Sequence, residues 1–415
     1  MAGQTFAQRI LGAKAGRPVR PGEVVDVPVD VALTHEVLGP PTFAMFEELG
    51  VPVWDPDKVF VTIDHFVPAA TAAQANNNRV TEEIVRRHGI THTAFYDGPS
   101  HQTLAESGMV APGMVVVGTD SHTCTAGALG AFATGIGSTE MVGVLATGRI
   151  WFRVPEAGLV ELTGRLRPGT SAKDIVLHLL GGLGVAGCRY ESIEYGGPGL
   201  RELPMDERIV LANMAVELGA KVGLLETDGR TADFLSSAPR TEYRVESDAP
   251  YIRRIAIDLS ELEPMCAKPH SVDNVAPVRE VAGKVPIHQA FIGSCTGGRL
   301  SDYRVAADVL EGHRVHDGVR LIVTPASKVV YRQMLLEGLV ERLSAAGAMV
   351  MAPSCGPCAG LQGGVLADGE NVISASNRNF VGRMGNPGAN VYLASPATVA
   401  ASAVTGTITD PRDMM

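Results

Sequence analysis

Four short apolar runs in this chain each end in a loop rich in glycine and polar residues. We expect all four to be strands: Met114–Gly118, Ala290–Ile292, Ala348–Ala352 and Val372–Ala375. Strand-to-helix turns of α/β proteins have this composition, and ligands gather outside the carboxyl ends of their strands. The pattern therefore predicts an α/β fold whose functional site is built on strand-end loops.

Helix signals follow these runs. A helix capped by Ser138 is expected to run towards Ile150, and another is expected to start near Ser301. Ser395-Pro396 is a good helix start, because serine caps helices and proline suits the first helical position. We expect this last helix to end at Thr405-Gly406.

The chain of 415 residues is too long for a single core, so it is expected to form two or three α/β domains. The helical pattern of apolar residues ends near Pro155. The stretch Lys268–Pro277 contains prolines, and its apolar residues show only weak periodicity. These boundaries predict three domains, 1–155, 156–277 and 278–415.

Charge and hydropathy argue against two classes of partner. The net charge is −10, from 35 Lys and Arg against 45 Asp and Glu, and there is no long basic run, which disfavours nucleic-acid binding. There is no run of eighteen apolar residues, so we expect no membrane span. Met1 to Arg20 lacks the apolar core of a secretory signal, and a cytoplasmic location is expected.

The cysteines carry the first chemical signal. They are Cys124, Cys188, Cys266, Cys295, Cys355 and Cys358. Six in 415 residues do not make a disulfide framework. Incidental, buried cysteine is a good interpretation of Cys188 and Cys266, but it suits the Gly- and Pro-containing C-G-P-C of Cys355 and Cys358 poorly.

Two further interpretations of the C-G-P-C stay open. It is also the active-site tetrapeptide of thioredoxin, which indicates a dithiol redox motif. Alternatively, Cys355 and Cys358 hold a metal centre together with Cys295. Three thiolates are one too few for a closed zinc site. A [4Fe–4S] cluster held by three cysteines leaves one iron open to act as a Lewis acid.

Candidate acid–base groups follow other strand-like stretches. Asp64-His65 comes after Val59–Ile63, and an adjacent Asp can tune an imidazole for proton donation near neutral pH. His101 and the pair Asp120 and His122 are similar candidates. Taken one at a time these signals are weak, because most Asp-His pairs are incidental.

Two further groups have polar side chains suited to a site. Asn213 and Glu217 lie four apart in Met205–Lys221, which is expected to be a helix, so they share a face; a solvated helix face is the alternative. Arg378 and Arg383 lie near the last strand-end loop, and guanidinium groups bind carboxylates bidentately. Surface arginines are the alternative for this pair.

Together these motifs resemble those of the aconitase and isopropylmalate dehydratase family. The resemblance runs through essentially the whole chain, from Asp64-His65 through G-T-D-S-H-T, N-M-A-V-E-L-G-A and K-P-H to G-S-C-T, C-G-P-C and S-N-R-N-F-V-G-R. It implies one [4Fe–4S] cluster per subunit, held by Cys295, Cys355 and Cys358. It also implies a proton-handling network made of Asp64, His65, His101, Asp120, His122 and Glu217.

By the same resemblance, His65, oriented by Asp64, protonates a departing hydroxyl, and Asn377, Arg378 and Arg383 hold substrate carboxylates. The implied fold has three α/β/α domains around the cluster and a fourth, swivelling domain. We expect this chain to lack the fourth domain and a separate small subunit to supply it, together with the catalytic base. Gly297 stands where the family usually has Asn, a departure that bears on a hydrogen bond near the cluster.

The implied activity is that of a hydro-lyase, which moves a hydroxyl between adjacent carbons of a malate-type acid by dehydration and rehydration. The interconversion of 2- and 3-isopropylmalate, on the route to leucine, is the leading expectation. Homocitrate and citramalate (2-methylmalate) are alternative substrates. Two remote alternatives are a regulator whose cluster-free form binds RNA and a dithiol oxidoreductase.

Overall fold

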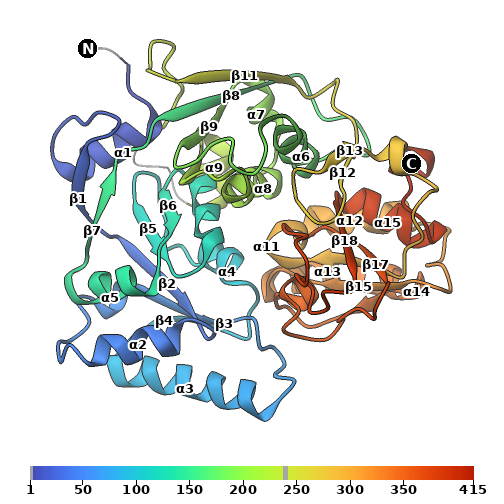
Figure 1. The fold of residues 1–415 in the computed structure, drawn as a ribbon, viewed down its shortest axis with the longest axis horizontal. Helices are drawn as coiled ribbons and strands as arrows, with labels where there is room; N and C mark the ends of the chain where they lie inside the picture. The colour runs from blue at the N-terminus through green and yellow to red at the C-terminus, as the bar shows by residue number, and fades with distance from the viewer. Residues whose placement is uncertain (1–2, 237–241) are drawn as a thin grey trace.

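In the computed structural model, which describes residues 3–236 and 242–415, most strands belong to three sheets flanked by helices (Figure 1). The three sheets follow one another along the chain, and their strands alternate with helices. Most neighbouring strands run parallel. The α/β class that the sequence predicts is therefore confirmed.

The first sheet consists of five parallel strands in the spatial order β4 (His92–Phe95), β3 (Val59–Ile63), β2 (Val31–His35), β5 (Val115–Gly118) and β6 (Phe132–Gly135). Every residue of β2, β3 and β5 is buried, as expected for a parallel sheet covered on both faces. Helices α2 (Gly39–Glu47) and α3 (Ala72–His88) pack side by side below this sheet in Figure 1. Helix α3 ends where Gly89 adopts a φ of 67°.

The second sheet consists of four parallel strands in the order β10 (Val222–Leu225), β9 (Ser192–Gly196), β8 (Ala157–Thr163) and β11 (Arg253–Asp258). Three elements pack between this sheet and the rest of the molecule: α6 (Ala172–Leu183), α8 (Met205–Asn213) and the 3-10 turn η3 (Met214–Leu218). Helix α6 begins with a capping box made by Ser171 and Asp174.

The third sheet has seven strands in the order β13 (Val275–Pro277), β12 (Met265–Ala267), β18 (Asn390–Ala394), β17 (Asn371–Ser374), β14 (Gln289–Gly293), β15 (Arg320–Thr324) and β16 (Met349–Val350). Only β12 runs antiparallel to its neighbours. Helices α12 (Leu300–Val309), α13 (Lys328–Leu336), α14 (Leu339–Ala345) and α15 (Pro396–Thr405) cover it (Figure 1). Ser395 caps α15 and Gly406 ends it in the left-handed region, as predicted.

A separate two-stranded ribbon joins β1 (Val24–Pro28) to β7 (Arg149–Arg153) in antiparallel register. Alternate residues of both strands are buried and exposed, so one face of the ribbon packs inward and the other faces solvent. Asp26 and Trp151 are paired on the exposed face. The ribbon lies at the left edge of the molecule in Figure 1.

The largest apolar core joins all three sheets. Val31 of the first sheet, Val160 of the second, and Phe291 and Val391 of the third belong to one contiguous cluster of buried side chains. Two smaller clusters fill the outer sides of the first and third sheets. The space between the sheets is therefore closed by packing, and the strand ends that face one another are held in fixed positions.

Three predicted element boundaries are wrong. Helix α5 (Ser138–Thr147) is preceded by Gly137 at its cap position, and it stops before Ile150 because Gly148 takes a φ of 67°. The expected strand Ala348–Ala352 is reduced to Met349–Val350 at the edge of the sheet. Loop residues beyond this edge have fewer partners for ladder hydrogen bonds.

The helix expected over Met205–Lys221 is also shorter than predicted. The α-helix ends at Asn213, and the chain continues as a 3-10 turn that Gly219 stops with a φ of 82°. No helix among the described residues is long and apolar enough to cross a membrane. The division into three domains at residues 155 and 277 stays a prediction.

Candidate active site

Side chains from strand ends of the first and third sheets line one cavity with about 360 Å³ of empty space. Ten of the predicted site residues line it: Asp64, His65, His101, Asp120, His122, Cys295, Cys355, Cys358, Asn377 and Arg383. The remaining two, Glu217 and Arg378, are hydrogen-bonded to this group. The structure thus brings together residues that lie hundreds of positions apart in the sequence.

Cys295 lies in α11 (Ser294–Gly297), a single turn that directly follows β14. Ser294 precedes it with a φ of 69°, a left-handed conformation that costs a non-glycine residue roughly 1–2 kcal/mol. This bend directs the Cys295 side chain into the cavity. The Nδ2 atom of Asn213 donates to the Cys295 sulfur over 3.3 Å.

Cys355 and Cys358 lie in the loop after β16, at the start of the 3-10 turn η4 (Gly356–Ala359). The backbone N–H of Cys355 donates to the carbonyl of Asp64 over 3.1 Å, which ties this loop to the end of β3. Arg383 donates from Nη2 to the sulfur of Cys358 over 3.4 Å. Cys188 and Cys266, for which the sequence suggests no special role, are buried outside the cavity.

The three sulfurs fit the ligand set of an iron–sulfur cluster. They line a single cavity, and N–H groups of Asn213 and Arg383 point at two of them, as at sulfur ligands whose charge is stabilised by hydrogen bonds. Burial raises the pKa of Cys295 to about 11. Burial opposes ionisation of Cys358 as well, but the Arg383 guanidinium outweighs it and lowers the pKa of that thiol.

Asp64 and His65 form the first acid–base pair at the end of β3. Nδ1 of His65 lies 2.8 Å from Oδ1 of Asp64, while the other carboxylate oxygen accepts from the backbone of Ser100 over 2.6 Å. Burial opposes protonation of His65, but the charges of Cys355 and Asp64 outweigh it and raise the pKa of the imidazole well above its ordinary value. The Asp64 carboxylate at Nδ1 therefore favours the protonated form of the His65 imidazole.

Asp120 organises a second group after β5. Its Oδ1 lies 2.8 Å from Nε2 of His101 and accepts from the backbone N–H of His122 over 2.7 Å. Burial raises the pKa of Asp120, yet His101 and His122 outweigh this and hold it well below the ordinary range. An ionised carboxylate therefore lies between two histidines at the cavity wall.

Glu217 belongs to the same group and lies in the 3-10 turn η3, which precedes β10 of the second sheet. One carboxylate oxygen lies 2.7 Å from Nε2 of His122, and the other accepts from Nε of Arg378 over 3.0 Å. Both Glu217 and Asn213 are buried, so the alternative of a solvated helix face is wrong. Arg378 is half-buried and Arg383 touches a cysteine, which also excludes free surface positions for the arginine pair.

The sequence interpretation missed His35 and Glu36 at the end of β2. The His35 ring stacks on His65, with ring centroids 4.6 Å apart. The buried Glu36 carboxylate accepts backbone N–H groups of His65 and Phe66 over 2.6 and 2.7 Å, so it shapes the turn after β3. The available signal was a His-Glu pair shortly after the apolar stretch Val31–Leu33, which was not predicted as a strand.

The sequence interpretation also missed Lys173 and Arg299, which bind the loops that carry site residues. The buried ammonium of Lys173 donates to the carbonyls of Ala375 and Ser376, directly before Asn377. The fully buried guanidinium of Arg299 donates to the carbonyls of Cys295 and Thr296 and to the side chain of Gln102.

Backbone carbonyls are present at every residue, so no sequence pattern marks these partners of Lys173 and Arg299.

Gly297 is explained by its neighbour. A Cβ atom added at this position would lie 2.4 Å from the Cβ of Ala375, far inside contact distance. The turn after β14 and the end of β17 therefore approach too closely for the side chain that the family usually has here. Asn213 and Asn377 instead supply amide groups beside Cys295, at 3.3 and 3.8 Å.

Three buried nitrogen atoms around the cavity have no hydrogen-bond partner among the residues that the structure describes. They are Nε2 of His35, Nδ1 of His101 and Nε of Arg383. Buried polar groups are nearly always satisfied, so such atoms indicate a polar ligand or water. Nε2 of His35 and Nε of Arg383 are donors, and together with the guanidinium of Arg378 they suit an anionic ligand.

Comparison with known proteins gives a consistent result. The profile of the Aconitase family (aconitate hydratase) matches residues 9–406. A Methanopyrus kandleri protein named 3-isopropylmalate dehydratase large subunit 1 is 52% identical, over 99% of each chain. A Thermotoga maritima protein with the same name is 46% identical, over 99% of each chain. A Methanothermobacter thermautotrophicus protein named probable methanogen homoaconitase large subunit is 46% identical, over 99% of this chain and 98% of its own.

Proposed function

Because this chain belongs to the aconitase family, we propose that it is the large subunit of a hydro-lyase that interconverts 2-isopropylmalate and 3-isopropylmalate, a step towards leucine. The observation that carries this proposal is the full-length similarity to large subunits named for that activity. The acid–base groups and thiols of the cavity are the groups that such a reaction needs. The expected cytoplasmic location belongs to the same proposal.

The family implies an iron–sulfur cluster as the cofactor. We propose one [4Fe–4S] cluster per subunit, held by Cys295, Cys355 and Cys358. When bound through three thiolates, such a cluster supplies a Lewis-acidic iron that polarises a hydroxyl and a neighbouring carboxylate. The donors that face the sulfurs, from Asn213 and Arg383, support this assignment.

His65 is the proposed general acid. The imidazole is held by Asp64 at Nδ1, and its raised pKa keeps it protonated at neutral pH, so it can donate a proton to a departing hydroxyl. On rehydration the same imidazole takes a proton back from water. Asp120 and His122 also line the cavity and complete the proposed proton-handling network with His101 and Glu217.

Arg378, Arg383 and Asn377 are the proposed carboxylate-binding residues. The guanidinium of Arg378 is bound to Glu217 through Nε only, which leaves its two terminal amino groups for a substrate carboxylate. Nε of Arg383 has no partner among the described residues. A small hydroxy di- or tricarboxylic acid therefore matches the donors of the cavity.

The relatives' names imply a small-subunit partner. We propose that this partner carries the swivelling domain and supplies the base that removes the proton from the carbon next to the hydroxyl. The groups lining the cavity support this division, because His65 is held protonated and the carboxylate of Asp120 is occupied by two histidines. Neither is free to act as that base.

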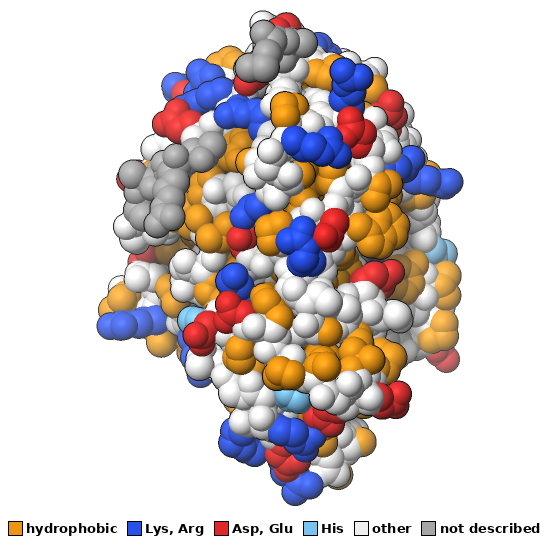
Figure 2. Space-filling model, turned by 90° about the vertical axis from the view of Figure 1, so that its left-hand side faces the viewer, with side chains coloured by type: hydrophobic (Ala, Val, Ile, Leu, Met, Phe, Trp, Pro, Cys, Tyr) orange, Lys and Arg blue, Asp and Glu red, His pale blue; other side chains and the backbone are white. Residues whose placement is uncertain are grey.

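Homocitrate is the second candidate substrate class, since one relative of 46% identity is named a homoaconitase large subunit. A regulator that binds RNA is not favoured. Figure 2 shows acidic and basic side chains interspersed with apolar ones on the face it presents, with no continuous basic patch among the described residues drawn there.

The dithiol oxidoreductase interpretation is also disfavoured. A redox dithiol uses two thiols, whereas Cys295 lines the same cavity as Cys355 and Cys358, as a centre with three thiol ligands requires. Insulin reduction that persisted without iron, and that required Cys355 and Cys358 only, would restore this interpretation.

The decisive experiment is oxygen-free purification of this chain together with a co-expressed small subunit. Turnover of isopropylmalate, citramalate and homocitrate is then compared with cluster absorbance and iron content. We expect the highest kcat/KM with isopropylmalate and negligible turnover by the large chain alone. A preference for homocitrate or citramalate would overturn the substrate assignment, and full activity without a partner would overturn the divided site.

A further inference from the structure

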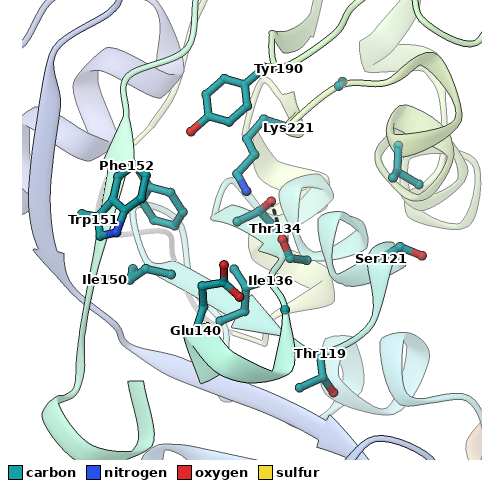
Figure 3. Close-up of a pocket in the computed structure, with 14 residues that line it drawn as sticks. Thr119, Ser121, Thr134, Ile136, Glu140, Ile150, Trp151, Phe152, Tyr190 and Lys221 are labelled. Atoms are coloured by element: carbon teal, nitrogen blue, oxygen red, sulfur yellow. Dashed lines mark hydrogen bonds between the residues drawn. The ribbon is translucent and has the colours of Figure 1, made fainter. Parts of the chain in front are cut away.

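A second hollow, with about 1090 Å³ of empty space partly open to solvent, lies beside the candidate active site. It is bounded by β7, by the ends of β5 and β6, by the start of α5 and by the loop before β10 (Figure 3). None of the residues that line it belongs to the cavity of the cysteines. It is therefore a feature separate from that cavity.

The hollow and the active site are built on the two sides of the same turns. Thr119 and Ser121 line the hollow, while Asp120 between them lines the active-site cavity. In the same way Val216 lines the hollow, and Glu217, the next residue, binds His122. A molecule seated in the hollow would consequently contact the turns that position two groups of the site.

One wall of the hollow is apolar and carries an exposed tryptophan. Ile150, Trp151 and Phe152 of β7 lie along this wall in Figure 3, with Ile136 across from them. The Trp151 side chain is 65% exposed, among the largest exposures of any apolar side chain described. Tryptophan at the surface beside a hollow is typical of residues that anchor protein–protein interfaces.

Lys221 supplies one charge on the opposite wall, where its ammonium points into the hollow (Figure 3). It lies 5.5 Å from the ring centroid of Phe152 and 5.6 Å from that of Tyr190. Glu140 lines the same hollow and its charge acts on Lys221, but among the residues that the structure describes no carboxylate lies within ion-pair distance of this ammonium. Burial lowers the pKa of this lysine, so a carboxylate brought to it would gain a strong partner.

We propose that this hollow is the docking site of the small subunit, which places an apolar side chain against Trp151 and a carboxylate on Lys221. The inference rests on the proposed function, because it needs a partner that closes the active site. Such a partner has to cover the turns that carry Asp120 and Glu217, and the hollow is formed by the reverse side of those turns. A partner seated in the hollow contacts the turns that carry Asp120 and Glu217.

The occupant is therefore defined by position and by charge. An apolar anchor with a neighbouring Asp, Glu or chain-terminal carboxylate complements an exposed indole next to an unpaired ammonium. A free carboxylic acid alone would satisfy Lys221 but leave Trp151 uncovered. A second copy of this chain would cover Trp151 but would not bring a catalytic base to the site.

The test measures the Kd between the cluster-loaded large chain and the purified small subunit. We expect Trp151→Ser to raise Kd by about 30-fold or more, as for a central anchor. Lys221→Gln should raise it by about tenfold, with Lys221→Glu weaker still. Leu336→Ser is the matched control and should leave Kd unchanged. Leu336 is 69% exposed and lies on α13, a helix that covers the third sheet.

Activity at saturating small subunit separates docking from catalysis. All four variants should then reach a kcat within about twofold of the wild type. An unchanged Kd in Trp151→Ser and Lys221→Gln, with normal activity, would refute the docking site and leave the proposed function intact. If the wild-type chain neither bound a small subunit nor gained activity from one, both proposals would fall.

Photo-crosslinking identifies the occupant directly. Benzoylphenylalanine placed at position 151 should give an adduct between the large and small subunits, and the same group at position 336 should not. An adduct between two large chains would show that a second copy occupies the hollow and would overturn the assignment. Circular dichroism of each variant checks that it is folded.

Discussion

Nε2 of His122 lies 2.7 Å from Oε1 of Glu217, although the two residues belong to different sheets' loops and lie far apart in the sequence. The second oxygen of the same carboxylate accepts from Arg378 over 3.0 Å. Glu217 therefore couples a proton-handling histidine to a residue proposed to hold a substrate carboxylate. Burial alone would raise the pKa of Glu217. Contacts with His122 and Arg378 outweigh burial and lower this pKa, so the charge of Glu217 matters for both partners.

Glu217→Gln should loosen both contacts while keeping the size of the side chain. Without the carboxylate charge, Arg378 is no longer fixed for a substrate, and the raised pKa of His122 falls. We expect KM for isopropylmalate to rise about tenfold and kcat to fall as well. Steady-state kinetics of the complex with the small subunit measure both, and an unchanged KM would contradict the coupling.

Asp64→Asn tests the proposed general acid. Burial opposes protonation of His65, and Cys355 and Asp64 raise its pKa; removing the Asp64 charge should therefore lower that pKa. Activity that needs protonated His65 is then lost at a lower pH, so the alkaline limb of the kcat profile moves to lower pH.

The companion variant His65→Asn should lower kcat by about 10²–10⁴-fold and abolish that limb. A profile that keeps its alkaline limb in His65→Asn would assign the limb to another group.

Cys295→Ser should remove both the cluster and the activity, because it leaves two of the three proposed thiolate ligands. Iron and sulfide content and visible absorbance of oxygen-free protein measure the loss. Cys266→Ala is the control, since Cys266 is buried in β12 away from the cavity and should keep its iron. Normal iron content in Cys295→Ser would disprove the ligand set.

Lys173→Met tests a positioning residue. The Lys173 ammonium is buried and holds the carbonyls of Ala375 and Ser376 at the turn that leads to Asn377. We expect KM to rise about tenfold, because the turn before Asn377 is displaced. Iron content should be retained, because no cysteine is displaced. Removing the ammonium also leaves two buried carbonyls without this donor, which should cost about 1–3 kcal/mol of stability.

Lys328→Met, at an exposed lysine on α13, is the matched control and should leave KM unchanged. Loss of iron in Lys173→Met would indicate a structural role for Lys173 instead.

Asp302 predicts a pH dependence of stability. Burial and the nearby Glu207 raise its pKa from 3.8 to about 8. The folded state thus keeps a proton that the unfolded state has released between these values, so the free energy of unfolding falls as pH rises through this window. The slope from one such group is about 1.4 kcal/mol per pH unit.

Asp302→Asn should flatten the decline in urea midpoint between pH 5 and pH 8. Asp308→Asn, at an exposed position of the same helix, should not. Equal slopes in Asp302→Asn and the wild type would contradict the raised pKa.

Much of the fold was predictable because its signals are local. The strands at Val59–Ile63 and Val372–Ala375 are continuous apolar runs, and the last helix has a serine cap, a proline and a terminal glycine. The shortened helix α8 was not predictable in the same way. Its apolar pattern continues past Asn213, but the chain after Asn213 forms a 3-10 turn. In this turn Glu217 contacts His122, which lies in a loop of the first sheet.

The site residues also differ in whether a local sequence pattern marks them. Cys355, His65 and Arg378 were predictable because short motifs carry them. Lys173 and Arg299 were not, because each stabilises a loop through backbone carbonyls that any residue type presents. His35 was missed as well, because the strand that ends with it was not predicted and its stacking on His65 depends on the order of strands in the sheet.

The shared apolar core has a consequence for biosynthesis. Val31 and Val391 lie near opposite ends of the chain yet belong to one cluster of buried side chains. While the ribosome is still translating the third sheet, the partners of that core and the last cluster-facing residues, Asn377 and Arg383, are missing. The core that encloses the cavity can therefore close only once the strands of the third sheet have been translated.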